Sequence, residues 1–218
     1  MVPYFDRDGI VIYHADCSDV LPDIDPDSVD LLLTDPPYGI NLKTDYAKRK
    51  RGHSRTDYPA VYGDDQPFDP TPLLRYGRCV LWGANNYADR LPPTQSWMVW
   101  DRKVNPGVST AHAELAWTNL GGTVRMFRHM WVGHWRESER HWHVHPTQKP
   151  AALMRWIIDR WTKPGDLVLD PYMGSGPVAQ ACHELGRRYI GIELVEDYCK
   201  VAVSRLAQQT LDLDGGAA

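Results

Sequence analysis

The sequence is poor in cysteine and has no long apolar run. Its four cysteines lie far apart and form no Cys-x-x-Cys pair, so we expect neither a disulfide framework nor a zinc knuckle. No stretch approaches the roughly 18 consecutive apolar residues that a membrane helix needs. Residues 1–8 also lack the basic and then apolar order of a signal peptide. These absences predict a soluble, cytoplasmic protein with no membrane partner.

The composition is typical of one folded domain. The 218 residues are 43% hydrophobic, which supplies enough apolar material for a core. Charged residues make up 24%, a normal share that excludes disorder as the general state. We therefore predict a single domain over residues 1–218.

Charge is distributed unevenly along the chain. Residues 1–42 contain nine acidic residues and one basic residue, whereas residues 43–55 contain six basic residues and one acidic residue. The net charge of −4 argues against a protein that coats nucleic acid without specificity. The basic segment lies in a long polar loop at about 40–66 and suggests local contact with an anionic partner, although a solvated loop explains the charges equally well. Its basic residues are Lys43, Lys48, Arg49, Lys50, Arg51 and Arg55.

Strand and helix patterns alternate through much of the chain. Apolar runs and alternating patterns predict strands at 10–14, 29–34, 78–82, 97–100, 114–118, 124–127, 167–169 and 188–192. Helical patterns predict helices at 85–90, 151–161, 176–185 and 196–209. This alternation favours an α/β fold around a mostly parallel central sheet.

One predicted strand ends in a glycine-rich loop. Residues 170–176 read Asp-Pro-Tyr-Met-Gly-Ser-Gly and lead from that strand into a helix. Ligands of such sheets bind at the carboxyl ends of the strands, where glycines let a ligand approach the backbone. Glu193 ends the next strand, where an acid commonly binds ribose hydroxyls. Because the loop is not Gly-x-Gly-x-x-Gly, we favour an adenosine-bearing cofactor other than a dinucleotide or ATP; a plain glycine-rich turn is the alternative.

A second strand ends in Asp35-Pro36-Pro37-Tyr38. The Asp35 carboxylate and the Pro36 carbonyl offer two hydrogen-bond acceptors and no nucleophile, which suits a substrate that carries an amino group. Tyr38 would supply a flat face for a planar ring. An ordinary Pro-Pro turn before an exposed tyrosine explains the same residues without a function.

Taken together, these motifs resemble the amino-group DNA methyltransferases that use S-adenosyl-L-methionine. Residues 33–39 look like the catalytic tetrapeptide of that family with its flanks, and residues 145–150, His-Pro-Thr-Gln-Lys-Pro, look like a second family signature. Residues 170–176 resemble the methionine-binding loop, and residues 14–17 resemble the segment whose aspartate meets the adenine of the cofactor. Because the catalytic motif precedes the cofactor loop, the chain is similar to the β group of these enzymes over nearly its whole length.

The resemblance implies a single Rossmann-like methyltransferase domain with a circularly permuted motif order and a small target-recognition segment at about 120–144. It also implies methyl transfer to the N6 amine of adenine in a base flipped out of double-stranded DNA. The implied catalytic residues are Asp35, Pro36, Pro37 and Tyr38. The implied cofactor-binding residues are Asp16, Thr147, Lys149, Asp170, Pro171, Tyr172, Gly174, Ser175, Gly176 and Glu193. For Lys149 there is an alternative, a helix-start residue whose ammonium extends into water.

Basic and aromatic side chains supply the predicted DNA contacts. The basic residues at 43–55 would follow phosphates, and Arg125, Arg128 and Arg136 would read or stack on bases. Most of the tryptophans are expected in the core instead. The histidines at 141–145 could share one strand face, but they have no acid or cysteine at ligand spacing, so no metal is expected.

Several alternatives are excluded or stay open. Protein-glutamine methyltransferases place a similar turn after the cofactor loop, and no Pro-Cys pair supports cytosine-C5 chemistry. Cytosine-N4 methylation, an RNA substrate and an inactive nucleic-acid-binding module with this fold stay open. His112 and Glu114 resemble a family segment and are expected to be structural. By resemblance we expect a homodimer and a role in DNA methylation of the restriction-modification kind.

Overall fold

The computed structural model describes residues 1–42, 61–105, 107, 110–132, 135–139 and 147–214, with side chains up to residue 208. Within these residues the main sheet contains β1 (Phe5–Arg7), β2 (Ile10–His14), β3 (Leu31–Thr34), β4 (Cys79–Trp82), β5 (Trp97–Asp101), β6 (Ala113–Thr118), β7 (Arg125–Arg128), β10 (Leu167–Asp170) and β11 (Arg188–Glu193). These nine strands lie in the order β1-β2-β11-β10-β3-β4-β6-β5-β7. A separate two-stranded hairpin pairs β8 (Trp131–Val132) with β9 (Trp135–Arg136).

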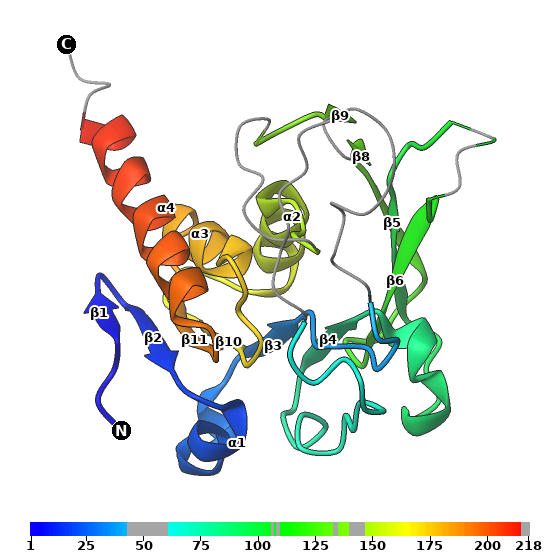
Figure 1. The fold of residues 1–218 in the computed structure, drawn as a ribbon, viewed down its shortest axis with the longest axis horizontal. Coiled ribbons are helices and arrows are strands. Elements are labelled where there is room, and N and C mark those ends of the chain that lie inside the picture. Colours follow the sequence, from blue (N-terminus) through cyan, green and yellow to red (C-terminus); the bar gives the residue numbers. More distant parts are fainter. Residues whose placement is uncertain (43–60, 106, 108–109, 133–134, 140–146, 215–218) are drawn as a thin grey trace.

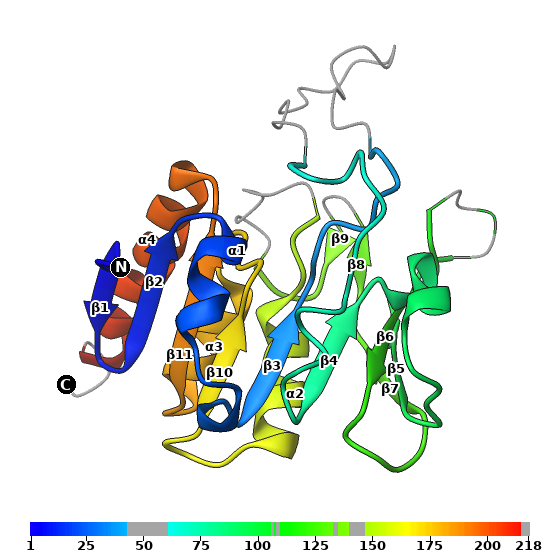
Figure 2. The same ribbon diagram turned by 90° about the horizontal axis from the view of Figure 1, so that it is seen from below.

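Most strands of the sheet point in one direction. The neighbours β2, β11, β10, β3 and β4 are parallel, as Figure 2 shows. β6 runs antiparallel to both β4 and β5, and β7 is parallel to β5, so β5 and β7 share the direction of β4. Only β1 and β6 oppose the others among these strands. The prediction of a mostly parallel α/β sheet is confirmed.

Helices and loops cover both faces of the sheet. α2 (Ala151–Trp161), α3 (Pro177–Glu184) and α4 (Glu196–Asp214) lie on one face, and the short α1 (Cys17–Val20) lies on the other (Figures 1 and 2). Alternate residues of β3 point to opposite faces: Leu31 and Leu33 join the core under α2 and α3, whereas Leu32 packs in the other core with Leu73 and Tyr76. Burial on both faces explains the continuous apolar run of this strand.

The bounds of α2 follow from its sequence. Pro150 precedes the first turn with an extended backbone, a position where its missing N–H costs no hydrogen bond. Leu153, Met154, Ile157 and Ile158 recur at helical spacing and are all buried against the sheet. The helix covers residues 151–161, as predicted.

The structure corrects several predicted elements. The segment at 85–90 forms two 3-10 turns, at Ala84–Asn86 and Ala88–Arg90, and not one helix. β1 and the β8–β9 hairpin were not predicted, because two- and three-residue strands carry no clear alternation. Among the described residues, none of the helices is long and apolar enough to cross a membrane.

The sheet brings the two special loops together. β3 and β10 are adjacent and parallel, so both end at the same edge of the sheet. Asp35 follows β3, Asp170 ends β10 and Glu193 ends the neighbouring β11. This edge is where ligands of open parallel sheets bind.

Candidate active site

The turn after β3 folds back on its own first residue. The Tyr38 hydroxyl donates a hydrogen bond to Asp35 Oδ1. Lys149, which precedes α2, places its Nζ 2.6 Å from Asp35 Oδ2 and donates to the Tyr38 hydroxyl at 3.0 Å. Only 3% of the Lys149 side chain is exposed, so its ammonium lies inside the protein. The alternative of a Lys149 ammonium extended into water is therefore wrong.

Glu114 on β6, which is partly exposed, completes the cluster around the buried Lys149. Its Oε2 lies 3.1 Å from Lys149 Nζ, so the ammonium sits between two carboxylates. Burial lowers the pKa of Lys149, but the charges of Asp35 and Glu114 raise it by more, so Lys149 remains a cation. Burial raises the pKa of Asp35, Lys149 opposes that shift, and Glu114 adds to it. Sequence reasoning assigned Glu114 only a structural role, because nothing in its own strand indicates a partner beside α2.

Asp64 holds the backbone of the turn that follows β3. Its Oδ1 accepts N–H bonds from Tyr38 and Gly39 at 2.9 Å each and from Ile40 at 3.3 Å, and its Oδ2 accepts from Leu42 at 2.6 Å. Asp64 is 4% exposed, so these bonds are shielded from water. Sequence reasoning missed Asp64, because an aspartate in a polar loop resembles any surface residue.

Two glycines leave room for the turn. Gly83, after β4, has φ +70°, and a Cβ there would overlap the Tyr38 ring. Gly39 has φ +76°, and a Cβ there would lie 2.6 Å from the backbone oxygen of Gln66. Both positions combine a left-handed backbone with close contact, a combination that only glycine accepts without strain.

Asp170 anchors the second half of the site. Its Oδ1 accepts the Thr34 hydroxyl at 2.6 Å, which links the ends of β3 and β10, and its Oδ2 accepts the Tyr189 hydroxyl at 3.4 Å. Burial raises the pKa of Asp170 to about 7, and the bond from Thr34 opposes the shift. Asp170 thus stiffens the base of the loop.

Glu193 and Asp16 fix the backbone around the glycine loop. The Glu193 carboxylate accepts the N–H groups of Gly174 and Val195, both at 2.8 Å. Asp16 Oδ1 accepts the Ser18 N–H at 2.8 Å and so caps α1. Each carboxylate keeps acceptor sites for a further donor, such as a hydroxyl or an amine of a ligand.

One pocket joins the two loops. It is lined by all four predicted catalytic residues and by every predicted cofactor-binding residue except Gly176. A Cβ on Gly176 would lie 2.7 Å from the Cβ of Ala202, so this glycine allows α3 and α4 to pack. The other predicted residues on the wall are Asp16, Asp35, Pro36, Pro37, Tyr38, Thr147, Lys149, Asp170, Pro171, Tyr172, Gly174, Ser175 and Glu193.

The pocket wall contains polar atoms suited to a bound molecule. Ser175 Oγ and Gln148 Oε1 are buried and have no hydrogen-bond partner among the described residues. Buried polar atoms normally have a partner, so both are available to a ligand or to water. With the carboxylates of Asp16 and Glu193, these donors and acceptors fit a polar, adenosine-bearing cofactor.

The predicted DNA-contacting arginines lie in different places. Arg128, at the end of β7, is exposed, and its Nε lies 3.4 Å from Asp101 at the site edge of the sheet. Arg125 starts the same strand at the opposite edge, with its guanidinium 6.0 Å from the Trp161 ring centroid. Arg136 is 6% exposed and stacks on Trp131 at 4.0 Å, which leaves little of it for contact with DNA. The basic segment at 43–55 lies outside the described residues.

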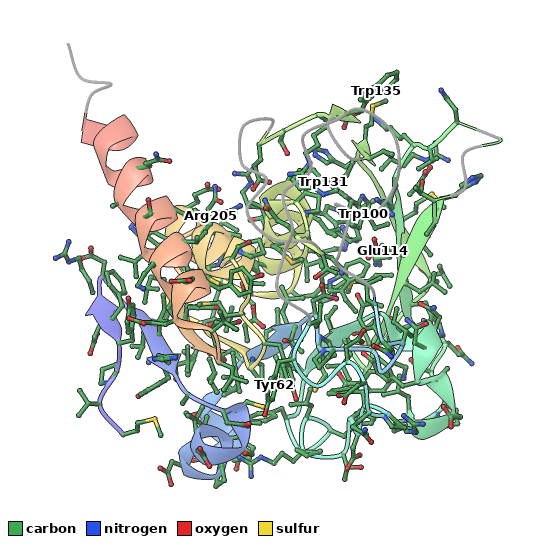
Figure 3. The ribbon with its side chains drawn as sticks, viewed as in Figure 1. Tyr62, Trp100, Glu114, Trp131, Trp135 and Arg205 are labelled. Atoms are coloured by element: carbon green, nitrogen blue, oxygen red, sulfur yellow. The ribbon has the colours of Figure 1, made fainter. Side chains whose placement is uncertain are left out.

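The tryptophans are mainly core residues, as predicted. Trp82, Trp100, Trp117 and Trp131 are buried. Among the large apolar side chains of the hairpin, Trp135 is the exception, because 71% of this residue is exposed. Figure 3 shows Trp135 at the outer end of the molecule, away from the sheet. Among the described residues no group of three histidine, cysteine or acidic side chains could hold a metal; the histidines at 141–145 lie outside that part of the chain.

Comparison with known proteins places the chain among methyltransferases. The N6_N4_Mtase family, described as DNA methylase, matches residues 85–204. The chain is 25% identical to type II methyltransferase M2.DpnII of Streptococcus pneumoniae, over 94% of this chain and 92% of that protein. It is 24% identical to type II methyltransferase M2.LlaDCHI of Lactococcus lactis subsp. cremoris, over 94% and 91%.

Solved structures agree with this placement. The M1.HpyAVI-SAM complex is 25% identical, with a TM-score of 0.57 over 90% of this chain and 98% of that one. PvuII DNA methyltransferase, a cytosine-N4-specific enzyme, is 14% identical with a TM-score of 0.62, over 90% and 86%, and shares the fold. Since the family match spans more than half of its length, the chain belongs to the N6/N4 DNA methylase family.

Proposed function

We propose that this protein transfers a methyl group from S-adenosyl-L-methionine to the exocyclic N6 amine of adenine in double-stranded DNA. The observation that carries the proposal is the shared pocket, which the acceptor turn at 35–38 and the glycine loop at 170–176 line together. A methyl donor on the loop and an amine on the turn would therefore meet in one cavity. Membership in the DNA methylase family supports DNA as the substrate.

The cofactor half of the pocket would hold S-adenosyl-L-methionine. Asp16 and Glu193 are the proposed partners of its adenosine, and Thr147 and the loop at 170–176 are the proposed partners of its methionine end. Ser175 Oγ, buried without a partner among the described residues, is a ready hydrogen-bonding group for that ligand. When bound, the cofactor supplies a methyl group on a positively charged sulfur.

The catalytic turn would bind and polarise the amine. The amine lone pair of adenine is delocalised into its ring, which makes the nitrogen a poor nucleophile. Asp35 and the Pro36 carbonyl would accept its two hydrogens and so stabilise the positive charge that develops on the nitrogen. Tyr38, whose ring lies in the space that the missing side chain of Gly83 leaves open, would stack on the base once the base has left the duplex.

The proposal also covers the target base, the circular permutation of the domain and the segments that contact DNA. An aspartate at the first position of the tetrapeptide supports adenine over cytosine N4. The catalytic turn precedes the cofactor loop in the chain, which supports a circularly permuted methyltransferase domain over residues 1–218. We assign target recognition to residues 120–144, which include the β8–β9 hairpin, and phosphate contacts to the basic segment at 43–55 and to Arg128. A homodimer and a restriction-modification role remain expectations by family resemblance.

Replacement of Asp35 tests the proposal. We expect Asp35→Ala to lose methyl transfer to DNA while it still binds S-adenosyl-L-methionine, because Asp35 belongs to the acceptor turn. Transfer of labelled methyl groups to DNA and to RNA would be measured in parallel, with calorimetry for cofactor binding. Activity retained in Asp35→Ala would overturn the assignment of the turn, and transfer to RNA alone would overturn the choice of substrate.

A further inference from the structure

The ion cluster around the buried Lys149 ammonium contains two carboxylates, Asp35 and Glu114, where a simple ion pair would have one. Lys149 Nζ lies 2.6 Å from Asp35 Oδ2 and 3.1 Å from Glu114 Oε2. Asp35 Oδ1 accepts the Tyr38 hydroxyl, so each oxygen of Asp35 already has a donor. An incoming amine would therefore share Asp35 with Lys149 and Tyr38, because a carboxylate can accept more than two hydrogen bonds.

A lone Asp35–Lys149 pair would be poorly suited to the reaction. An ammonium in contact with a carboxylate stabilises its charged form and makes it a weaker proton acceptor. Methyl transfer leaves the amine nitrogen with a positive charge and a proton to lose. A second carboxylate that draws the ammonium toward itself restores the acceptor strength of Asp35.

Glu114 is held in place for such a role. Its Oε1 lies 3.6 Å from Arg102 Nη1, and its Oε2 faces Lys149. Arg102 in turn donates from Nε and Nη2 to the backbone oxygen of Trp131 on β8, at 3.1 and 2.9 Å. Its guanidinium also lies 5.6 Å from the Trp100 ring centroid. Figure 3 shows Glu114, Trp100 and Trp131 in the same region, between β6 and α2.

We propose that Glu114 is a positioning residue for methyl transfer: it shares the Lys149 ammonium with Asp35 and takes the larger share when the target amine binds Asp35. This inference rests on the proposed function. Arg102 connects Glu114 to the β8–β9 hairpin, so the hairpin fixes where the Lys149 ammonium sits.

The reaction step balances around Asp35. The amine lone pair forms the N–C bond to the methyl carbon, and the C–S bond breaks with its electron pair going to sulfur. The nitrogen then gives one proton to the Asp35 carboxylate, and this proton passes to solvent. Throughout, Lys149 keeps its proton and moves toward Glu114.

The pH dependence of turnover gives a readout specific to this role. Removal of the Glu114 charge takes a like charge away from Asp35, so the pKa of Asp35 falls. The acidic limb of the kcat profile therefore moves to lower pH in Glu114→Gln, whereas a general structural defect lowers kcat without moving the limb. The titratable groups that act on Asp35 or are acted on by it are Lys149, Glu114, Tyr38, Tyr87 and Asp170.

Three variants of the full chain test the inference. For Glu114→Gln we expect kcat to fall about 10- to 100-fold, as when an orienting partner of a catalytic group is lost, with the KM for DNA nearly unchanged. Glu114→Asp keeps the charge and should keep the wild-type position of the acidic limb. Glu184→Gln, which removes an ion pair between Glu184 at the end of α3 and Arg155 on α2, should behave as wild type. A Glu114→Gln variant with wild-type kcat and an unmoved acidic limb would overturn the inference.

A measurement without turnover separates this inference from the proposed function. The Lys149 ammonium would be titrated by ¹⁵N NMR in wild type and in Glu114→Gln, with thermal unfolding to check that both are folded. Because Glu114 raises the pKa of Lys149, this pKa should fall in the variant. An unchanged pKa would refute the shared ion pair, whatever the wild-type protein methylates. Absence of methylation by wild type with a lowered Lys149 pKa would refute the proposed function alone.

Discussion

Replacing Asp64 with alanine should release the turn at 35–38, which we propose to be catalytic, while leaving the glycine loop intact. Asp64 accepts four backbone N–H groups, and a hydrogen bond to a charged acceptor contributes about 1.5–3 kcal/mol. Those four bonds share one side chain, and Ile40 is exposed, so water reaches part of the freed backbone. We therefore expect the free energy of unfolding to fall by about 2–4 kcal/mol, well below the simple sum.

Urea unfolding, methyl transfer and calorimetry of cofactor binding would be measured on the same variants. Methyl transfer should suffer more than cofactor affinity in Asp64→Ala, because the four N–H groups belong to the turn and not to the loop at 170–176. Asp64→Asn should be intermediate, since its amide oxygen still accepts from Tyr38 and Gly39 but its NH₂ group cannot accept from Leu42. The neighbouring, exposed Asp65→Ala is the matched control. Equal stability of Asp64→Ala and Asp65→Ala would show that the four bonds to Asp64 do not stabilise the turn.

Two further predictions follow from the site. Gly83→Ala should displace the Tyr38 ring and lower kcat about tenfold or more, since a misplaced group costs that much. Gly63→Ala is the control, because Gly63 has a similar φ of +76° but a Cβ there meets no atom closer than 3.7 Å, so this variant should lose less turnover. Equal kcat values in the two variants would contradict the role of Gly83 in seating Tyr38. Asp170 has a pKa raised to about 7, so its burial makes the folded protein lose stability as pH rises from about 4 to about 7. Asp170→Asn should flatten this part of the stability curve, measured by urea unfolding at several pH values, and an unchanged slope would show that Asp170 does not set it.

Local patterns in the sequence predicted the sheet and the two loops. The apolar run before Asp35 and the spacing in α2 depend on neighbours in the chain, and both elements form where they were expected. The resemblance gave the residues of the pocket wall, including Lys149, from motifs far apart in sequence. Strand order then placed those motifs at one edge, because parallel neighbours must end together.

The contacts that the sequence did not predict join residues that lie far apart in the chain. Asp64 bonds to residues of the turn that lie 22 to 26 positions earlier in the chain, and Glu114 on β6 contacts Lys149 just before α2, so neither leaves a local pattern. The exposure of a side chain is equally hard to predict from local patterns, because it depends on residues far away in the chain. Arg136 had the sequence context of a surface cation, yet it is buried and stacks on Trp131, its partner across the β8–β9 hairpin.

The identity of the modified base tests the proposed DNA methylation most directly. Purified protein would be incubated with unmethylated DNA and S-adenosyl-L-methionine, and the digested nucleosides would be identified by mass spectrometry for wild type and Asp35→Ala. We expect N6-methyladenine with wild type and none with the variant. N4-methylcytosine would contradict the choice of base, and no modified base despite cofactor binding would contradict DNA methylation itself.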